Sequence, residues 1–257
     1  MKRVKYRDSS GVYWGELRDE QIHPLVDMTG ERMGGDLDFT EVAPPDVTLL
    51  APCEPRAIVC VGKNYAEHIR EMGGDEGQLP SAPGLFLKAL NTLSNPGDAV
   101  PYPSWTQNLH YEGELAVVVG KRMKEVAEAD ALAHVLGYTC ALDVTARDKQ
   151  RSDLQWTRGK SADGFCPLGP WLETDLDPSN LSVQTRVNGE LKQDGNTADL
   201  IFSVGAILAY VSTFMTLEPG DVVLTGTPDG VGPLHVGDEV EVSVEGVGTL
   251  KNRVEAA

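Results

Sequence analysis

The sequence lacks the features of membrane, secreted and zinc-binding proteins. Its longest nearly apolar stretch, Ile201–Val211, is far shorter than the roughly 20 residues that a membrane helix needs. Residues 1–10 are polar and charged, without the apolar core of a signal peptide. The four cysteines form no CxxC pair, so we expect buried free thiols rather than a disulfide or a zinc site. These absences predict a soluble, cytoplasmic protein.

Basic residues are also scarce relative to acidic ones. The chain has 22 Lys and Arg against 39 Asp and Glu, which gives a net charge of −17. Nucleic acids and anionic membrane surfaces bind through clustered Lys and Arg, so neither is an expected partner. A small anionic substrate is compatible with this charge, because a local cation can reverse the sign of the potential in one pocket.

The 257 residues, 41% of them hydrophobic, predict an α+β fold with a mostly antiparallel β component. The clearest strand signals are the apolar run Ala57–Gly62, the alternating run Val240–Val244 and the Asn188-Gly189 hairpin turn. Residues 1–50 form a small β-rich segment, with its clearest strand at Gly11–Leu17. Prolines near residue 50 mark the boundary to a larger domain at 51–257.

Three segments carry helical signals. They are Tyr65–Met72, which Asn64 could cap, and the ranges Glu125–Leu136 and Ala198–Phe214, which have apolar residues at helical spacing. Between Gly73 and Gly84 the chain is rich in Gly and Pro, which predicts a mobile surface loop. Such a loop beside a site often acts as a lid.

Three carboxylates are candidate metal ligands. Glu112 and Glu114 are two apart at the start of a strand-like run, so their side chains share one face and repel each other unless a cation lies between them. An exposed strand end with two solvated Glu is the alternative. Asp143 follows the apolar run Tyr138–Leu142 and could supply a third oxygen, or simply begin a turn. Three carboxylates favour Mg²⁺ or Mn²⁺ over zinc and leave positions open for substrate.

Other residues are candidates for acid–base and anion-binding roles. His68 and Glu71 lie three apart in the predicted helix, where the carboxylate could orient the imidazole as a base, or form an ordinary surface pair. Lys160 could stabilise an oxyanion or enolate, or be a solvated lysine. The glycine-rich Thr225–Gly232 segment could hold a substrate carboxylate through backbone N–H groups and a threonine hydroxyl, or form a tight hairpin.

Taken together, these segments resemble the fumarylacetoacetate hydrolase family over about residues 56–254. The resemblance is strongest to short acylpyruvase-like and 2-hydroxyhepta-2,4-diene-1,7-dioate isomerase-like members. The motifs that carry it occur in the family's order: Gly62-Lys63-Asn64-Tyr65-Ala66-Glu67-His68, Phe86-Leu87-Lys88, Tyr111-Glu112-Gly113-Glu114-Leu115, Leu142-Asp143-Val144-Thr145-Ala146-Arg147-Asp148, Gly159-Lys160 and Thr225-Gly226-Thr227-Pro228-x-Gly230-Val231-Gly232.

The resemblance implies a rolled mixed β-sheet catalytic domain, paired as a homodimer. It also implies a site, whose members are given in chain order. His68 and Glu71 match a catalytic pair on a lid, Glu112, Glu114 and Asp143 match metal ligands, Lys160 matches an active-site lysine, and Arg147, Gln150 and Thr227 match substrate contacts. The implied metal is Mg²⁺ or Mn²⁺, with Ca²⁺ as a possible substitute.

The expected substrate is a small anionic 2-oxo acid, first of all a 2,4-dioxo acid such as an acylpyruvate or a fumarylpyruvate-like compound. The first reaction that we consider is hydrolytic carbon–carbon cleavage with His68 as the base. Tautomerisation, double-bond isomerisation or decarboxylation of a dioate such as 2-hydroxyhepta-2,4-diene-1,7-dioate or oxaloacetate would need the same enolate without attack by water. A non-catalytic metal- or ligand-binding domain is the third possibility.

Overall fold

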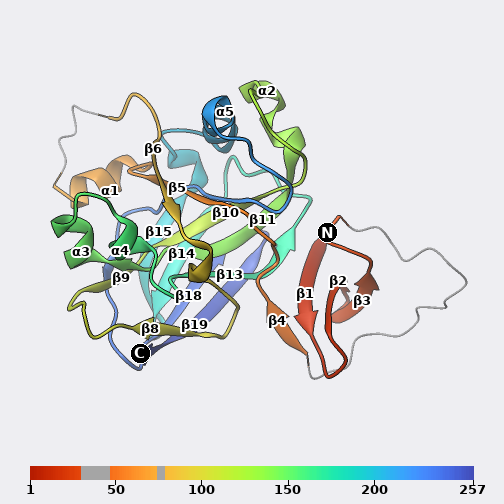
Figure 1. Ribbon diagram of the computed structural model, residues 1–257, viewed down its shortest axis with the longest axis horizontal. Coiled ribbons are helices and arrows are strands. Elements are labelled where there is room, and N and C mark those ends of the chain that lie inside the picture. The colour runs from red at the N-terminus through yellow and green to blue at the C-terminus, as the bar shows by residue number, and fades with distance from the viewer. Residues whose placement is uncertain (30–46, 74–78) are drawn as a thin grey trace, which may run out of the picture.

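A computed structural model of the protein describes residues 1–29, 47–73 and 79–257. Strands dominate it and helices are short, which confirms the α+β, mostly β class (Figure 1). The strands form a large mixed sheet, a five-stranded sheet and a small three-stranded sheet. Of the predicted Gly73–Gly84 loop, residues 74–78 lie outside the described residues, and Gly84 already begins a strand.

The bounds of the elements are as follows. The strands are β1 (Lys2–Arg7), β2 (Val12–Arg18), β3 (Gln21–Leu25), β4 (Thr48–Leu50), β5 (Ile58–Gly62), β6 (Gly84–Lys88), β7 (Leu93–Ser94), β8 (Ala99–Tyr102), β9 (Leu109–Tyr111), β10 (Gly113–Val119), β11 (Val135–Leu142), β12 (Thr145–Ala146), β13 (Cys166–Glu173), β14 (Ser182–Val187), β15 (Glu190–Asn196), β16 (Val222–Leu224), β17 (Gly232–Pro233), β18 (Glu239–Val244) and β19 (Gly248–Ala256). The helices are α1 (Ala66–Glu71), α2 (Glu128–Ala131), α3 (Arg147–Ser152), α4 (Thr157–Lys160) and α5 (Val204–Phe214).

Strand β10 lies at the centre of the large sheet. All seven of its residues are buried, as expected for a nearly continuous apolar run. It pairs antiparallel with β11 on one side and with β16 on the other, and β16 continues to β5 and β6. The ends of these strands therefore bring Glu112, Glu114 and Asp143 to one place.

The five-stranded sheet covers one face of this central region. In β14 and β18 buried residues alternate with partly exposed ones, so each strand turns one face toward the large sheet. β18 packs against β10 and β11, and β19 packs against β13. The largest hydrophobic core lies between the two sheets, and includes Leu115, Val117, Val183 and Val242. The predicted hairpin is confirmed, with Asn188 and Gly189 between β14 and β15.

The N-terminal strands β1–β3 lie at one side of the molecule (Figure 1). β1 pairs with β2 and β4, and only Lys2 and Arg3 continue the pairing into β13 of the large sheet. A small separate core of Val4, Tyr6 and Ile22 holds the strands together. The described part of the segment 1–50 is thus β-rich.

The predicted helix Glu125–Leu136 is wrong over most of its length. Only α2 is α-helical, a 3-10 turn follows at Leu132–His134, and Val135 already begins β11. Because β11 pairs along the whole of β10, the β-branched Val135 belongs to the strand despite the helical spacing of the apolar residues. What is left of the helix packs against α5 at the top of the view in Figure 1.

The predicted helix Ala198–Phe214 begins six residues late, and Asn64 explains the difference. The Asn64 side chain is buried and does not cap α1; it accepts a hydrogen bond from the Phe202 N–H (2.8 Å) and donates to the backbone oxygens of Phe202 and Thr225. This contact holds residues 201–202 in an irregular conformation. The helix α5 then begins after Ser203, whose hydroxyl accepts from the Ala206 N–H.

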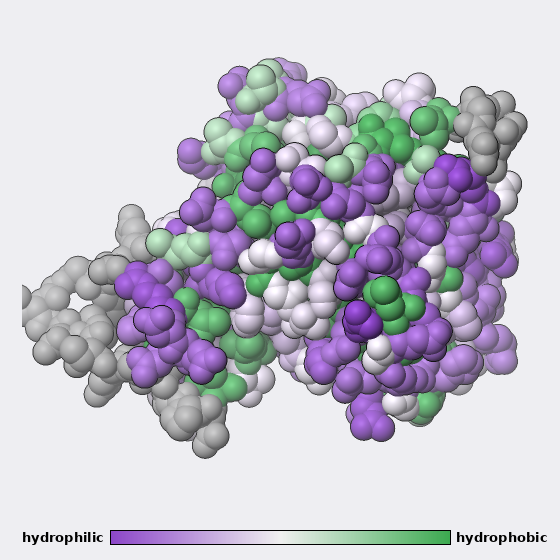
Figure 2. Space-filling view, turned by 180° about the vertical axis from the view of Figure 1, so that it is seen from behind, coloured by the Kyte–Doolittle hydropathy of each residue, from purple (hydrophilic) through white to green (hydrophobic). Residues whose placement is uncertain are grey.

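The surface is mostly polar, in keeping with the charge of −17. On the face shown in Figure 2, hydrophilic residues predominate and hydrophobic ones are scattered or in small groups. Within the described ranges, no helix has both the length and the apolar character needed to cross a membrane. All four cysteines are buried and free, as expected.

The buried carboxylate of Asp221 joins the starts of β5 and β16. It accepts hydrogen bonds from the backbone N–H groups of Arg56 (2.8 Å), Ala57 (2.9 Å) and Glu218 (2.8 Å). We predict that Asp221→Ala lowers the free energy of unfolding by about 2–3 kcal/mol, because three amides lose their charged acceptor. Urea denaturation followed by circular dichroism measures this, and the exposed Glu255→Ala control should change it by less than about 0.5 kcal/mol. Equal stability of the two variants would contradict the assignment.

Candidate active site

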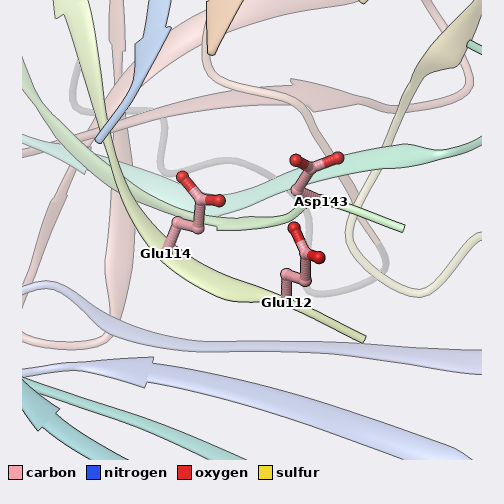
Figure 3. Close-up of side chains that lie close together, drawn as sticks. All are labelled: Glu112, Glu114 and Asp143. Atoms are coloured by element: carbon pink, nitrogen blue, oxygen red, sulfur yellow. The ribbon is translucent and has the colours of Figure 1, made fainter. Parts of the chain in front are cut away.

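Three carboxylates meet where β10 and β11 leave the large sheet. Glu112 precedes β10, Glu114 is its second residue and Asp143 follows β11 (Figure 3). All three are buried, and one oxygen of each lies within 4.8 Å of the others. This places together the three ligands that the sequence predicted and excludes the exposed strand end as an explanation of Glu112 and Glu114. The cluster could hold one hard divalent cation.

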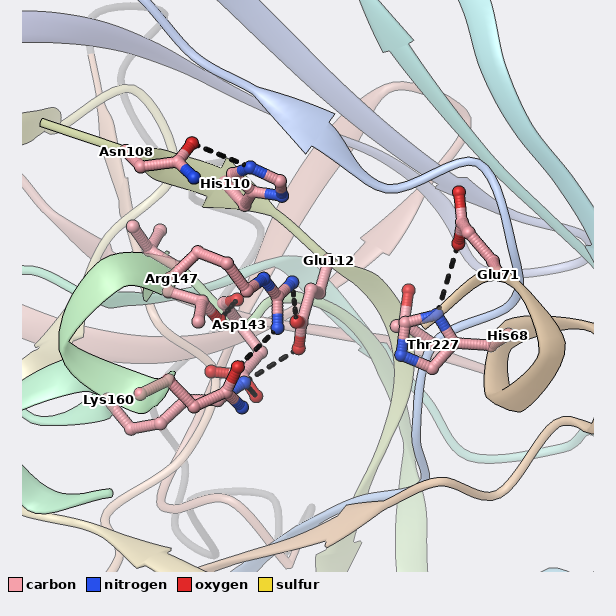
Figure 4. A network of polar contacts seen from close by, with 12 residues as sticks. His68, Glu71, Asn108, His110, Glu112, Asp143, Arg147, Lys160 and Thr227 are labelled. Carbon is pink, nitrogen blue, oxygen red and sulfur yellow. Dashed lines mark hydrogen bonds and ion pairs between the residues drawn. The ribbon is translucent and has the colours of Figure 1, made fainter. Parts of the chain in front are cut away.

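Three buried cations surround this cluster, of which Figure 4 labels Arg147 and Lys160. Lys160, at the end of α4, donates to Glu112 Oε2 (2.7 Å) and to Asp143 Oδ2 (2.6 Å), and is therefore no solvated lysine. Arg147, the first residue of α3, forms an ion pair with the other oxygen of Glu112. Lys88, at the end of β6, donates to Asp143 Oδ1 and to the Val144 carbonyl. The positive charges offset the repulsion that buried carboxylates would otherwise suffer.

The two glutamates of the cluster titrate in opposite directions. Burial alone would raise the pKa of Glu112, but Lys160 and Arg147 hold it well below its usual range. Among the described residues, no cation forms an ion pair with Glu114. Burial and the carboxylates of Asp143 and Glu112 raise its pKa well above its usual range, while the charge of Lys160 and the Gly226 N–H favour the ionised form. Burial and like charge thus favour the neutral form of Glu114, whereas the neighbouring cations favour the ionised form of Glu112.

The carboxylates around Lys160 favour its positively charged form. Burial alone would lower the pKa of Lys160, but Asp143 and Glu112 raise it well above its usual range. Two of its three N–H groups are used by these carboxylates, and its Nζ also lies 4.9 Å from the centre of the Phe86 ring, which lines the cavity. Lys160 can therefore stabilise negative charge on a ligand, but it is a poor proton donor.

The predicted His68–Glu71 pair forms in α1. His68 is buried, and its Nδ1 lies 3.3 Å from Glu71 Oε2. Glu71 also accepts from the Gly230 N–H at 3.1 Å, so the glycine-rich segment fixes the carboxylate that orients the imidazole. With Nδ1 facing Glu71, the other ring nitrogen is the one available to exchange a proton with a ligand.

A cavity of about 240 Å³ joins these groups. Seven of the nine predicted site residues line it: His68, Glu112, Glu114, Arg147, Gln150, Lys160 and Thr227. The other two stand behind this wall, Glu71 against His68 and Asp143 against Lys160. Gln150 accepts from Arg147 Nη1 at 2.6 Å, which holds the guanidinium against Glu112. The roles of these residues in catalysis stay predictions.

The structure adds a histidine that the sequence analysis did not single out. His110, in β9, donates a hydrogen bond from its Nε2 to Asn108 Oδ1 (2.8 Å; Figure 4). Burial and the nearby Arg147 lower the pKa of His110 to about 4. It is therefore neutral at physiological pH, and His68 is the histidine that faces the cavity.

Gln193 is a second residue that sequence reasoning missed. It belongs to β15 of the other sheet, is 1% exposed, and reaches the site only through the fold. Its Oε1 accepts from the Gly113 N–H (2.9 Å), and its Nε2 donates to Thr227 Oγ1 (2.7 Å) and to the Pro228 carbonyl (2.8 Å). Gln193 thus provides the hydrogen-bond acceptor for the Gly113 N–H, which lies outside the part of β10 that pairs with β16. No local pattern marks such a residue.

The Thr225–Gly232 segment is not a tight hairpin, because β16 and β17 belong to different sheets. Two of the donors that were expected to bind an anion already form hydrogen bonds within the protein. The Thr227 hydroxyl donates to the Gly113 carbonyl (2.9 Å), and the Gly226 N–H donates to Glu114 Oε2 (2.6 Å). The segment therefore positions Glu114 and Glu71 before it contacts any ligand.

We predict that Gln193→Leu lowers the free energy of unfolding by about 1–3 kcal/mol, since it strands the buried Gly113 N–H and Pro228 carbonyl. Chemical denaturation measures this. Gln184→Leu is the matched control in the neighbouring strand β14, because the Gln184 side chain donates its hydrogen bond to the exposed Asp194. A similar loss in both variants would show that the contacts of Gln193 have no special weight.

Comparisons with known proteins agree with this geometry. Residues 57–255 match the family described as fumarylacetoacetate (FAA) hydrolase, C-terminal. The chain is 48% identical over 204 residues to the mitochondrial oxaloacetate tautomerase FAHD1 of Bos taurus, covering 77% of this chain and 91% of that protein.

Two solved structures are similar as well. A 2-hydroxyhepta-2,4-diene-1,7-dioate isomerase from Mycobacterium marinum superimposes with a TM-score of 0.89 at 40% identity, over 100% of this chain and 98% of the other. A fumarylpyruvate hydrolase from Pseudomonas aeruginosa, in complex with Mn²⁺ and pyruvate, gives 0.75 at 34% identity over 84% and 94%. With its fold, its carboxylate cluster and these matches, the chain belongs to the fumarylacetoacetate hydrolase family.

Proposed function

We propose that the protein is a divalent-metal-dependent enzyme that moves a proton at the carbon next to the keto group of a small 2-oxo acid. The observation that carries this proposal is that the carboxylates of Glu112 and Glu114 and the imidazole of His68 line one small cavity. The three buried carboxylates suit Mg²⁺ or Mn²⁺. The related fumarylpyruvate hydrolase was solved in complex with Mn²⁺. A bound ion would supply Lewis-acid stabilisation of charge on the keto oxygen.

The side chains around the cavity would transfer the proton and stabilise the charge. His68, oriented by Glu71, takes the proton from the carbon. The electron pair of the broken C–H bond forms a carbon–carbon double bond, and the π pair of the keto group moves onto its oxygen. The ammonium of Lys160 stabilises the negative charge that develops there. Arg147 lines the cavity, so its guanidinium would contact the substrate carboxylate. Return of the proton to oxygen completes a keto–enol tautomerisation.

Hydrolytic cleavage of an acylpyruvate or fumarylpyruvate-like substrate is the second candidate. It is favoured by the similarity to a fumarylpyruvate hydrolase, at lower identity than the tautomerase and the isomerase. In this reaction His68 would take a proton from water, which attacks the distal carbonyl. Products of oxaloacetate and acetylpyruvate decide between the candidates: unchanged mass indicates tautomerisation, a new carboxylic acid indicates hydrolysis, and CO₂ indicates decarboxylation.

We predict that metal binding releases protons from the site. Burial and the neighbouring carboxylates raise the pKa of Glu114 in the free protein, and a cation bound to Glu114 would favour its ionised form. The apparent affinity for Mg²⁺ should therefore rise about tenfold per pH unit below that pKa. Calorimetry in two buffers of different ionisation enthalpy counts the protons, with Glu114→Gln as the control that binds Mg²⁺ weakly and releases none. Tight binding without proton release would contradict the role of Glu114.

We predict that His68→Ala lowers kcat for oxaloacetate tautomerisation about 10²–10⁴-fold, because the base is lost. The affinity for Mn²⁺ should stay within about twofold, because His68 is not among the three carboxylates that form the candidate metal site. His235→Ala, whose side chain is exposed, is the control and should keep full activity. The ultraviolet absorbance of the enol follows the reaction. Full activity of His68→Ala would refute the proposed base.

A further inference from the structure

The side chain of Tyr111 links the carboxylate cluster to a distant glycine. Tyr111 is the last residue of β9, is 3% exposed and directly precedes Glu112. Its hydroxyl donates a hydrogen bond to the Gly230 carbonyl at 2.8 Å. The ring belongs to the largest hydrophobic core, where a phenylalanine would fill the same space. Packing therefore does not account for the hydroxyl, whereas its contact with Gly230 does.

Only a glycine fits at position 230. Its φ is +91°, in the left-handed region, and a Cβ there would lie 2.0 Å from the Lys192 carbonyl oxygen. A glycine also has the widest choice of backbone conformations, so by itself it does not fix the direction of its own N–H. The hydrogen bond from Tyr111 restricts this choice, because it holds the carbonyl of the same residue.

The strand pairing places the Tyr111 ring beside this turn. β17 pairs antiparallel with β9, and Gly232 lies opposite Tyr111. A Cβ on Gly232 would lie 2.8 Å from the tyrosine hydroxyl oxygen, so the missing side chain leaves room for the ring. From its position opposite Gly232, the hydroxyl reaches back two residues to Gly230. Both glycines thus permit the same contact.

The N–H of Gly230 is a donor that holds Glu71. It lies 3.1 Å from Oε1 and 3.2 Å from Oε2 of this glutamate, which is the last residue of α1. Oε2 of Glu71 is in turn 3.3 Å from Nδ1 of His68 (Figure 4). The Glu71 side chain is 32% exposed, so without this donor the carboxylate would gain rotational freedom in water. Tyr111 is thus connected to His68 through two hydrogen-bonded residues.

We propose that Tyr111 is a positioning residue for the base of the proposed reaction. Its hydroxyl fixes Gly230, whose N–H then holds Glu71 where the carboxylate orients the imidazole of His68. Tyr111 acts through these residues and does not contact the reacting atoms. Because Tyr111 adjoins Glu112, one short segment of the chain positions both a candidate metal ligand and the base. This inference rests on the proposed function for the role of His68.

The kinetic test removes the hydroxyl in two backgrounds. Tyr111→Phe should lower kcat for oxaloacetate tautomerisation about three- to tenfold, which is the effect of one lost hydrogen bond. In the Glu71→Ala protein the same change should have almost no further effect, because residues that act through one chain of contacts are not additive. The exposed Tyr210→Phe is the control and should keep full activity. Equal losses from Tyr111→Phe in both backgrounds, or no loss in either, would overturn the proposal.

Amide hydrogen exchange measured by NMR tests the positioning without any turnover. Two amides report the contact: Gly230, whose N–H is held by Glu71, and Met72, whose N–H closes the last turn of α1. In Tyr111→Phe both should exchange about three- to tenfold faster than in the native protein. The Ile207 N–H in α5 is the control and should be unchanged, since a general loss of stability would speed its exchange as well.

Exchange also separates failure of this inference from failure of the proposed reaction. If the protein tautomerises no oxo acid but Gly230 and Met72 exchange faster in Tyr111→Phe, the positioning of Glu71 stands and the proposed reaction is wrong. If neither amide changes its exchange rate, or if Ile207 changes equally, the positioning role of Tyr111 is wrong whatever the activity.

Discussion

The burial of three carboxylates within 4.8 Å of one another is the constraint on which the site depends. Such charges cannot leave water unless cations and hydrogen-bond donors replace it. Lys88 from β6, Arg147 from α3 and Lys160 from α4 supply the cations, and the Gly226 N–H supplies the donor for Glu114. Because these groups come from four separate parts of the chain, the large sheet must be assembled before the cluster exists. No ion pair with these cations is formed by Glu114, whose pKa burial and the other two carboxylates raise.

Much of the site could be predicted from the sequence because its members sit at fixed offsets from apolar runs. Glu112 and Glu114 flank Gly113 at the start of a buried strand, Asp143 ends the next one, and His68 and Glu71 are one helical turn apart. Gln193 could not be predicted, because only the pairing of β15 with β14 brings it to Gly113, 80 residues away. Lys88 had a weak signal, as a lysine after an apolar run, but nothing local indicated its contact with Asp143. The error at Glu125–Leu136 has the same cause: long-range pairing with β10 outweighed local helical spacing.

The cavity brings together two groups of side chains that are held in different ways. Buried ion pairs with Arg147 and Lys160 hold the carboxylate of Glu112. Hydrogen bonds to Glu71, and from the Gly230 N–H to Glu71, hold His68. In the proposed reaction the first group would bind the ion and the charged oxygen, and His68 would move the proton.

The central claim is that Glu112, Glu114 and Asp143 together hold one divalent ion. Anomalous X-ray diffraction from crystals grown with Mn²⁺ tests this most directly, since it locates the ion independently of activity. The account predicts a single strong peak bonded to one oxygen from each of the three carboxylates, and no such peak in Glu114→Gln crystals. A peak bound elsewhere, or none between these residues in crystals of the native protein, would contradict it.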